Sequence, residues 1–252
     1  NAAVTNHLIS RNPSSNIVVK NDNLVSERVV MTDEQQMQFL NIAKHRYYNE
    51  VYQILLSTGM RIGELTALQW DDIDFENKEI HIRHSMQSAY LNGKKILNMT
   101  TPKTSNSIRD IPMFDGVEKL FVFWKEKQDK AKKELGRRWR LPKEFENLVF
   151  TSSLGSPLTR YVLSNDINKI VSILNKNEEY LAEQENRVPK KFPKLHPHSF
   201  RHTFATRCFE KNLKPVFIMS IMGHSNYETT LSYTHLLKKS NDQQVSLAGS
   251  FV

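Results

Sequence analysis

Apolar residues recur at the three- and four-residue spacing of amphipathic helices through most of the chain. This pattern predicts helices over residues 33–43, 47–58, 115–136 and about 160–178. Thr32 stands before the first of these helices and polar first-turn residues follow it, so Met31-Thr32 is expected to mark the start of a domain. Residues 176–189 carry few apolar side chains and are expected to form an exposed excursion.

Residues 73–113 change to a two-residue period, in which apolar and polar side chains alternate. Turn-forming residues occur at 76–78, and Asn92-Gly93 is a strong hairpin signal. The segment predicts a small antiparallel sheet of about three strands, packed on helices. The apolar positions expected in its strands are Ile80, Ile82, Ile108 and Ile111. The predicted fold class is therefore mixed α+β and mainly α-helical.

The stretch between residues 195 and 235 predicts three short helices. His198 and Arg201 lie three positions apart on the first, so they project together from one edge of it. Pro215 suits the first turn of the second helix, and Gly223 suits its left-handed exit.

A capping-box pattern, Ser225 with Glu228, opens the third helix of this stretch. Two helix ends therefore bracket His224, and Tyr233 is expected about two turns further along the third helix. We interpret the stretch as part of a composite site at which a tyrosine hydroxyl attacks a phosphodiester.

Composition narrows the class of protein. The chain has 252 residues, a formal net charge of +8 and a sequence pI of about 9.4, which favours a polyanionic partner, although a basic surface also serves solubility. Cys208 is the only cysteine, which excludes an intramolecular disulfide and indicates a reducing compartment. No apolar run approaches the roughly 18 residues of a membrane span.

Positive charge gathers in residues 187–214, which hold eight lysines and arginines and a single acid, Glu210. Such focusing is expected where a phosphate backbone docks. A second basic segment, residues 136–146, surrounds Trp139, and there a DNA contact and a plain insertion loop explain the charge equally well. The candidate DNA-binding residues in the two segments are Arg137, Arg138, Arg140, Lys190, Lys191, Lys194 and Arg207.

The candidate site residues occur in an ordered set that resembles the tyrosine recombinases, also called phage-type integrases. The resemblance extends from about residue 29 to residue 237. It implies the catalytic fold of that family, with a three-stranded antiparallel sheet. The matching motifs are Thr58-Gly59-Met60-Arg61-Ile62-Gly63-Glu64-Leu65, Lys103 within TPKTSNSIRDIP, His198-x-x-Arg201, Gly223-His224 and Tyr233.

The residue types suit phosphodiester chemistry. Arg61 and Arg201 can clamp the nonbridging oxygens with forked donors that stay charged. His198 and His224 can donate to the same oxygens or move protons near neutral pH. Tyr233 is a poor nucleophile until a cationic pocket favours its phenolate, and Lys103 can supply the proton that the leaving deoxyribose oxygen needs.

Two of these residues have plainer explanations when each is taken alone. Glu64 is expected to buttress Arg61, but when these two residues are taken alone an ordinary surface ion pair between them is the better explanation. Lys103 taken alone is a solvated loop lysine. The rest of the motif set makes the catalytic interpretation of these residues the better one.

The resemblance implies site-specific recombination of double-stranded DNA through a covalent 3′-phosphotyrosine and a four-way junction, without metal or cofactor. It implies a tetramer on DNA in the bacterial cytoplasm, with accessory DNA-bending or directionality factors and no membrane association. The long segment before residue 113 resembles integrases of conjugative transposons and Gram-positive phages. Chromosome-dimer recombinases and invertases are the alternatives within the family.

The same resemblance suggests a domain division. Residues 1–13 are expected to be the end of an N-terminal DNA-binding domain that is mostly absent, and residues 14–28 a linker. Residues 29–237 are expected to be the catalytic domain. Residues 238–252 are expected to be a tail, which either docks on a neighbouring subunit or is a disordered terminus.

Other classes fit the sequence less well. Several histidines have spacings that zinc can use, but no cysteine pair or acidic ligand accompanies them, and two arginines among them would repel a dication. A type IB topoisomerase or telomere resolvase shares the same residue types. A DNA-binding regulator that has lost the reaction would lack at least one site residue, and none is missing. The histidines concerned are His196, His198, His202, His224 and His235.

Overall fold

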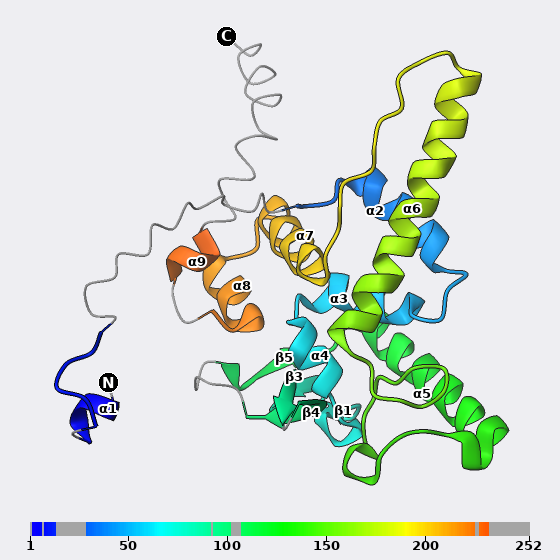
Figure 1. Ribbon diagram of the computed structural model, residues 1–252. Helices are drawn as coiled ribbons and strands as arrows, with labels where there is room; N and C mark the ends of the chain where they lie inside the picture. The colour runs from blue at the N-terminus through cyan, green and yellow to red at the C-terminus, as the bar shows by residue number, and fades with distance from the viewer. Residues whose placement is uncertain are drawn as a thin grey trace.

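A computed structural model gives the architecture of the chain (Figure 1). It describes residues 2–6, 8–13, 29–91, 93–101, 107–224 and 227–231. The fold is mainly helical with two small antiparallel sheets, which confirms the predicted fold class. The α-helices are α1 (Ala2–Thr5), α2 (Asp33–Ala43), α3 (Asn49–Thr58), α4 (Ile62–Ala67), α5 (Asp115–Leu135), α6 (Arg160–Gln184), α7 (Pro197–Glu210), α8 (Pro215–Met222) and α9 (Tyr227–Leu231). Short 3₁₀ segments occur at Trp70–Asp72, Gly136–Arg138 and Lys143–Phe145.

Local signals set the helix ends, as the sequence predicts. Thr32 caps α2 with a reciprocal pair of hydrogen bonds, in which Gln35 N donates to Thr32 Oγ1 and Thr32 N donates to Gln35 Oε1. Gly59 ends α3, and Gly223 ends α8; both have φ of +61°. Pro215 opens α8 at its first position.

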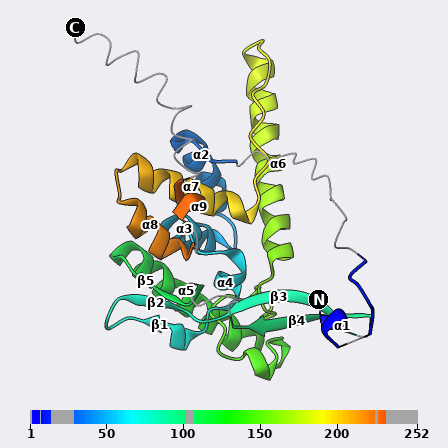
Figure 2. The same cartoon turned by 90° about the vertical axis from the view of Figure 1, so that its left-hand side faces the viewer.

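The strands form two sheets rather than the single predicted sheet. One has the order β1 (Ile73–Asp74), β2 (Glu79–Ile82), β5 (Arg109–Pro112), and the other is the hairpin β3 (Ser85–Leu91) with β4 (Lys94–Thr100). The hairpin extends away from the helical body as a long ribbon (Figure 2). In the described part of the chain its seven-residue strands pair with each other, and residues 109–112 pair with β2, with Ile80 opposite Ile111.

Ile108 is not a core strand residue, contrary to the prediction. It lies before β5 and is 47% exposed. The inward-facing positions of β5 are instead Arg109 and Ile111, two residues apart, and both are buried. Because one of the two inward-facing residues is an arginine, the spacing of apolar residues alone does not reveal which positions of β5 face inward.

The helix α6 is longer than the sequence predicts. It continues to Gln184, and residues 176–184 belong to the helix rather than to an irregular excursion. These residues include no glycine or proline and many are good helix formers, so nothing stops the helix there. Its far end stands clear of the body, and the chain returns alongside it to reach α7 (Figure 1).

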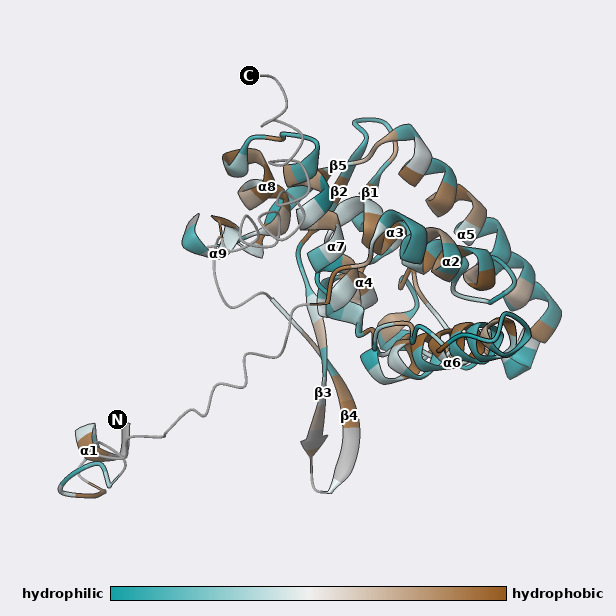
Figure 3. Ribbon diagram, turned by 90° about the horizontal axis from the view of Figure 1, so that it is seen from above, coloured by the Kyte–Doolittle hydropathy of each residue, from teal (hydrophilic) through white to brown (hydrophobic). Residues whose placement is uncertain are grey.

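The core lies between α2, α3, α5 and α7, and it supports the elements that carry the candidate site. Tyr52 of α3 stacks on Phe200 of α7 with ring centroids 5.5 Å apart, and Phe39 of α2 meets both rings edge-on. Hydrophobic and hydrophilic residues alternate along α5 and α6 in the view from above (Figure 3). None of the described helices combines the length and apolar composition needed to cross a bilayer.

Candidate active site

Arg61 lies between the left-handed turn at Gly59 and the first residue of α4, as the sequence predicts. Its Nη1 donates to Glu64 Oε1 at 2.8 Å, and its Nη2 donates to the carbonyl of Gly223 at 3.0 Å. The side chain is 34% exposed, and these two bonds use two of its five N–H donors. Arg61 is therefore anchored while part of its guanidinium faces solvent.

Arg201 is buried in α7, with 3% of its surface exposed. Its Nη1 donates to the carbonyl of Gly59 at 2.7 Å, and its Nη2 donates to the carbonyl of Met222 at 2.6 Å. The second arginine of the predicted clamp therefore ties the end of α3 to the end of α8.

The carboxyl end of α8 is the point at which these contacts meet. The carbonyls of Ile221, Met222 and Gly223 accept from Arg109, Arg201 and Arg61 respectively. The last carbonyls of a helix lack partners within the helix and carry its partial negative charge. Three arginines from different parts of the chain thus stabilise one helix end and are drawn together by it.

Glu64 is the buried acid of this network, at 3% exposed. Its Oε2 accepts from the Arg61 backbone N–H and from Arg109 Nη2, both at 2.8 Å, and its Oε1 accepts from Arg61 Nη1 and Arg109 Nη1. Burial alone would raise the pKa of Glu64, but the hydrogen bond and charge of Arg109, followed by the charge of Arg61, lower it to about 2. The predicted contact with Arg61 is present, and a second, unpredicted arginine shares it.

His224 directly follows the α8 exit and is buried. Its Nδ1 lies 2.8 Å from the hydroxyl of Thr230 on α9, which is fully buried. Its backbone N–H donates to the carbonyl of Met219, which continues the hydrogen bonding of α8. These two contacts fix the ring between α8 and α9.

His198 lies on the first turn of α7 and remains exposed, with its ring edge-on to that of His202 at a centroid distance of 5.7 Å. Partial burial of the ring, and then the charges of Arg201, Arg160 and Arg61, lower the pKa of His198 below its ordinary value. His198 therefore belongs to the electrostatic field of the arginines even though it faces solvent.

A groove of about 630 Å³ opens beside His198 and Arg61. The start of α6 and strand β3 supply its other walls, and its lining includes apolar residues. Arg160 and Tyr161 of α6 also line the groove; both are exposed, and Tyr161 is 66% exposed. The remaining lining residues are Ile62, Gly63, Thr66, Ser85, Met86, Gln87, Ser88, Leu97, Thr159 and Ser164.

Three residues of the predicted site lie outside the described part of the chain: Lys103, Tyr233 and the helix-capping Ser225. The described part of α9 ends at Leu231, two residues before Tyr233. Ser107, four residues after Lys103, accepts a hydrogen bond from Arg109 through its carbonyl. The roles of Lys103 and Tyr233 remain predictions.

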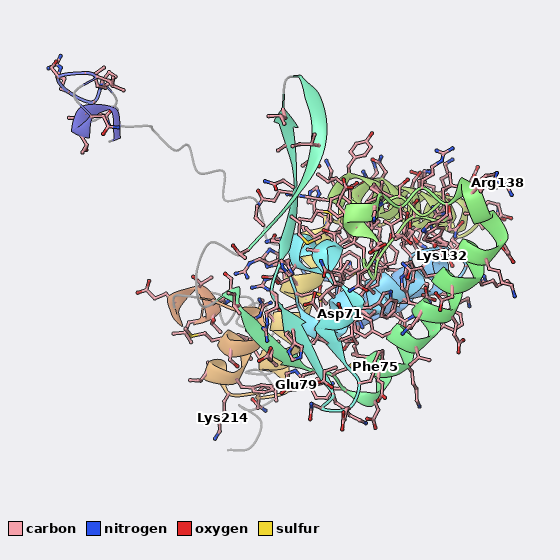
Figure 4. All side chains as sticks on the ribbon, turned by 90° about the horizontal axis from the view of Figure 1, so that it is seen from below. Asp71, Phe75, Glu79, Lys132, Arg138 and Lys214 are labelled. Atoms are coloured by element: carbon pink, nitrogen blue, oxygen red, sulfur yellow. The ribbon has the colours of Figure 1, made fainter. Side chains whose placement is uncertain are left out.

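The predicted DNA-contact residues are scattered. Figure 4 shows Arg138 beyond the end of α5, on the opposite side of the molecule from Lys214 and α8. Arg137 and Arg140 flank it in the chain and are exposed. Lys190, Lys191 and Lys194 lie on the segment that returns from α6 to α7, and all three are exposed there.

Arg207 is committed to internal contacts. It forms ion pairs with Asp33 and Glu210 and donates to the carbonyl of Met31, so it joins α7 to the start of α2. The basic charge of residues 187–214 is also partly used within the fold, because Arg187 pairs with Glu178 and Glu185. The net charge of residues 187–214 is therefore larger than the positive charge that is available to a binding partner.

Sequence reasoning missed two residues of the site, Arg109 and Arg160. Arg109 belongs to the TPKTSNSIRDIP motif, in which the alternating pattern marks it only as a strand residue. Arg160 follows Thr159, whose hydroxyl caps α6, and it reaches the groove only because the fold brings the start of α6 beside α7. No local signal identifies such a position.

Within the described residues, one group has the geometry of a metal site, namely Glu79, His81 and Asp110 on the β1-β2-β5 sheet. Arg83 Nη2 lies 2.6 Å from Asp110 Oδ1 and 3.3 Å from His81 Nδ1, so this group is an ion-pair network that a dication would have to displace. It is separate from the five histidines whose spacings in the sequence resemble those of zinc ligands.

Comparison with known proteins settles the family. The family described as "Phage integrase family" matches residues 30–240. The chain belongs to the phage integrase family. This confirms the resemblance that the motifs carry.

Curated phage integrase relatives are longer than this chain. A tyrosine recombinase XerC-like protein of Caldanaerobacter subterraneus is 27% identical, with 97% of this chain and 61% of the relative covered. The transposase from transposon Tn916 of Enterococcus faecalis is 31% identical, with 82% and 47% covered. The chain thus spans about half to three fifths of these relatives.

Solved structures confirm the catalytic fold. The Tn1549 transposon integrase in complex with a circular intermediate DNA superimposes with a TM-score of 0.68 at 29% identity, covering 92% of this chain and 69% of that chain. The XerA recombinase shares the fold, with a TM-score of 0.54 at 20% identity.

Proposed function

We propose that this chain is the catalytic part of a site-specific recombinase that integrates and excises a mobile DNA element. The observation that carries the proposal is the convergence of Arg61, Arg201 and His224 on the end of α8. Arg61 and Gly223 are 162 positions apart in sequence, and Arg201 and Gly59 are 142 apart. Folding has brought together the three groups that would surround a scissile phosphate.

The reaction follows from the charges. The Tyr233 hydroxyl gives its proton to His198 as its oxygen attacks phosphorus. The bond to the 5′ oxygen breaks, and that oxygen takes a proton from Lys103 and leaves as a hydroxyl. Negative charge that builds on the nonbridging oxygens is stabilised by Arg61 and Arg201 without reorganisation, because both are already held in place. The 3′-phosphotyrosine keeps the energy of the broken bond, so a second strand can attack it without ATP.

Working partners follow from the same proposal. Double-stranded recombination sites are the substrate, and four copies act on two sites through a four-way junction. Accessory bending or directionality factors belong to the proposal, as do the bacterial cytoplasm as the compartment and residues 238–252 as a docking tail. The division into the end of a DNA-binding domain, a linker and a catalytic domain is proposed with them.

A mobile element is preferred to chromosome-dimer resolution for one reason. The transposon Tn916 transposase and the Tn1549 integrase are 31% and 29% identical to this chain, although a XerC-like recombinase matches along more of it at 27%. A regulator that binds DNA without cutting it is the second candidate, and the absence of a covalent adduct would favour it.

The test is covalent capture on a nicked duplex from which the cleaved fragment diffuses away. The wild-type chain should give a slowly migrating adduct on a denaturing gel without added metal, and Tyr233→Phe should give none. Tyr161→Phe is the matched control, because Tyr161 is an exposed tyrosine at the groove beside His198. Loss of the adduct in Tyr161→Phe but not in Tyr233→Phe would overturn the assignment of the nucleophile.

A further inference from the structure

We infer that Arg109 is a positioning residue for DNA cleavage, which sets the geometry of Arg61 and of the α8 exit without touching DNA. The inference rests on the proposed function. Arg109 is buried, with 7% of its side chain exposed, and it comes from β5 rather than from any of the helices that carry the predicted clamp. Its side chain contacts three separate segments of the site.

The first contact fixes Glu64, and through it Arg61. Arg109 Nη1 and Nη2 donate to Glu64 Oε1 and Oε2 at 3.0 and 2.8 Å. Glu64 thus receives four N–H donors, two from Arg109 and two from Arg61. Without the donors from Arg109, the buried carboxylate would be compensated by Arg61 alone, which would draw that guanidinium inward and away from a phosphate.

The second contact fixes the end of α8. Arg109 Nε donates to the carbonyl of Ile221, next to the carbonyls that Arg201 and Arg61 hold. The fit is close, because a Cβ added at Gly223 would lie 3.0–3.1 Å from the Arg109 side chain. His224 follows at once in the chain, so its position depends on this packing.

The third contact reaches the segment that follows Lys103. Arg109 Nη1 also donates to the carbonyl of Ser107 at 3.1 Å. One guanidinium therefore bonds to the partner of the first arginine, to the helix end before His224 and to the chain four residues after the proposed acid. These bonds couple three segments that carry or adjoin proposed catalytic groups.

Arginine is required because of its shape. The Nε and the two Nη groups lie in one plane and donate in different directions at the same time, with two bonds to a carboxylate and two to carbonyls. A lysine at this position keeps the positive charge, but its single ammonium cannot reproduce the planar fork that bonds to both Glu64 and Ile221. Arg109→Lys therefore distinguishes the effect of the positive charge from the effect of the hydrogen-bond geometry.

The experiment compares Arg109→Lys with the wild type in single-turnover cleavage of the nicked duplex at saturating DNA. The assay temperature lies well below the thermal unfolding midpoint of each protein. Because small misplacements of catalytic groups cost on the order of 100-fold, we expect the rate to fall about 10- to 100-fold. The DNA dissociation constant should stay within about threefold, since Arg109 does not touch DNA.

Hydrogen exchange supplies a readout independent of activity. The amide hydrogens of Gly223 and His224, which bond to carbonyls within α8, should exchange faster in Arg109→Lys. Arg46→Lys is the matched control, because Arg46 makes an ion pair with Asp166 and neither residue lines the groove. It should lower stability and leave both the cleavage rate and the exchange near α8 unchanged.

The outcomes are distinct. A wild-type cleavage rate in Arg109→Lys, or a rate loss equal to that of Arg46→Lys, overturns the inference. No adduct from the wild type overturns the proposed function, and unchanged exchange at Gly223 and His224 then overturns the positioning role as well. If Arg109→Lys does not fold, Glu64→Gln replaces it, and wild-type cleavage by that variant contradicts the inference.

Discussion

Arg61 Nη2 donates to the carbonyl oxygen of Gly223 at 3.0 Å. This bond joins the start of α4 to the end of α8, which are 162 positions apart in sequence. Gly223 accepts in a left-handed conformation that turns its carbonyl toward the arginine at the end of α8. Arg201 makes the converse link, from α7 to the carbonyl of Gly59, the residue that ends α3. Each arginine of the clamp is thus held by a glycine turn in another part of the site.

Gly223→Ala should destabilise the protein more than Gly93→Ala. Both glycines have positive φ, at +61° and +74°, so alanine costs about 1–2 kcal/mol of conformational energy at either position. At Gly223 the new Cβ would also crowd Arg109 at 3.0 Å, whereas nothing lies within 4 Å at Gly93. Urea denaturation of the two variants measures the difference, and equal losses would contradict the close packing of Arg109.

Stability should fall in acid in part because of Glu64. Its folded pKa of about 2 lies below its ordinary value of 4.5, so the unfolded chain binds the proton more readily. The contribution of Glu64 is therefore present above about pH 4.5 and is lost as the pH falls toward 2. Chemical denaturation between about pH 2 and 6 should show a shallower acid loss in Glu64→Gln than in the wild type.

A comparison of the two curves isolates Glu64 from other acids that titrate in the same range, such as Glu178, whose pKa Arg187 also lowers to about 2. Parallel acid limbs in Glu64→Gln and the wild type would mean that the carboxylate is not held by Arg109 and Arg61.

The pKa of His198 should rise when an anion occupies the site. Partial burial and the charges of Arg201, Arg160 and Arg61 hold it below its ordinary value. A bound sulfate would offset the charges of the arginines and favour the protonated ring. The measurement is a proton NMR titration of the His198 imidazole C–H resonances in sodium sulfate and in sodium chloride of equal ionic strength. A pKa that is unchanged or lower in sulfate would contradict an anion site there.

Arg160→Ala should weaken DNA binding in a salt-dependent way. Arg160 lines the groove with Arg61 and His198, and removing one side chain that binds a phosphate reduces the slope of log affinity against log salt by about 1. Lys132→Ala is the control for loss of one charge, because Lys132 is exposed on the far part of α5 (Figure 4). Equal slopes in the two variants would exclude Arg160 from the interface.

The parts of the fold that can be predicted are those with local causes. Thr32, Gly59, Pro215 and Gly223 each mark a helix end through their own backbone or side-chain chemistry, and each does so in the structure. The position of Arg61 at a helix start follows from the glycine turn just before it. The ordered motif set identifies the family, although no single motif does so alone.

What the sequence could not predict depends on contacts between distant segments. Residues 94–100 pair with β3, and residues 109–112 pair with β2, but the alternating pattern fits either arrangement. Arg109 is a charged residue at an inward-facing position, so the pattern of apolar residues does not identify it. Its burial depends on Glu64, which is 45 positions away in sequence. Arg207 looks available for DNA in the sequence, but the fold places Asp33 beside it.

The proposed reaction requires that Tyr233 becomes covalently linked to DNA at a site that Arg61 and Arg201 form. Mass spectrometry of the trapped adduct after digestion by protease and nuclease, together with end-labelling of the released strand, detects this linkage directly. We expect a nucleotide remnant on Tyr233, attached through a 3′ phosphate, and a released strand with a free 5′ hydroxyl. A remnant on another residue, or a 5′ phosphate linkage, would show that the proposed reaction is wrong.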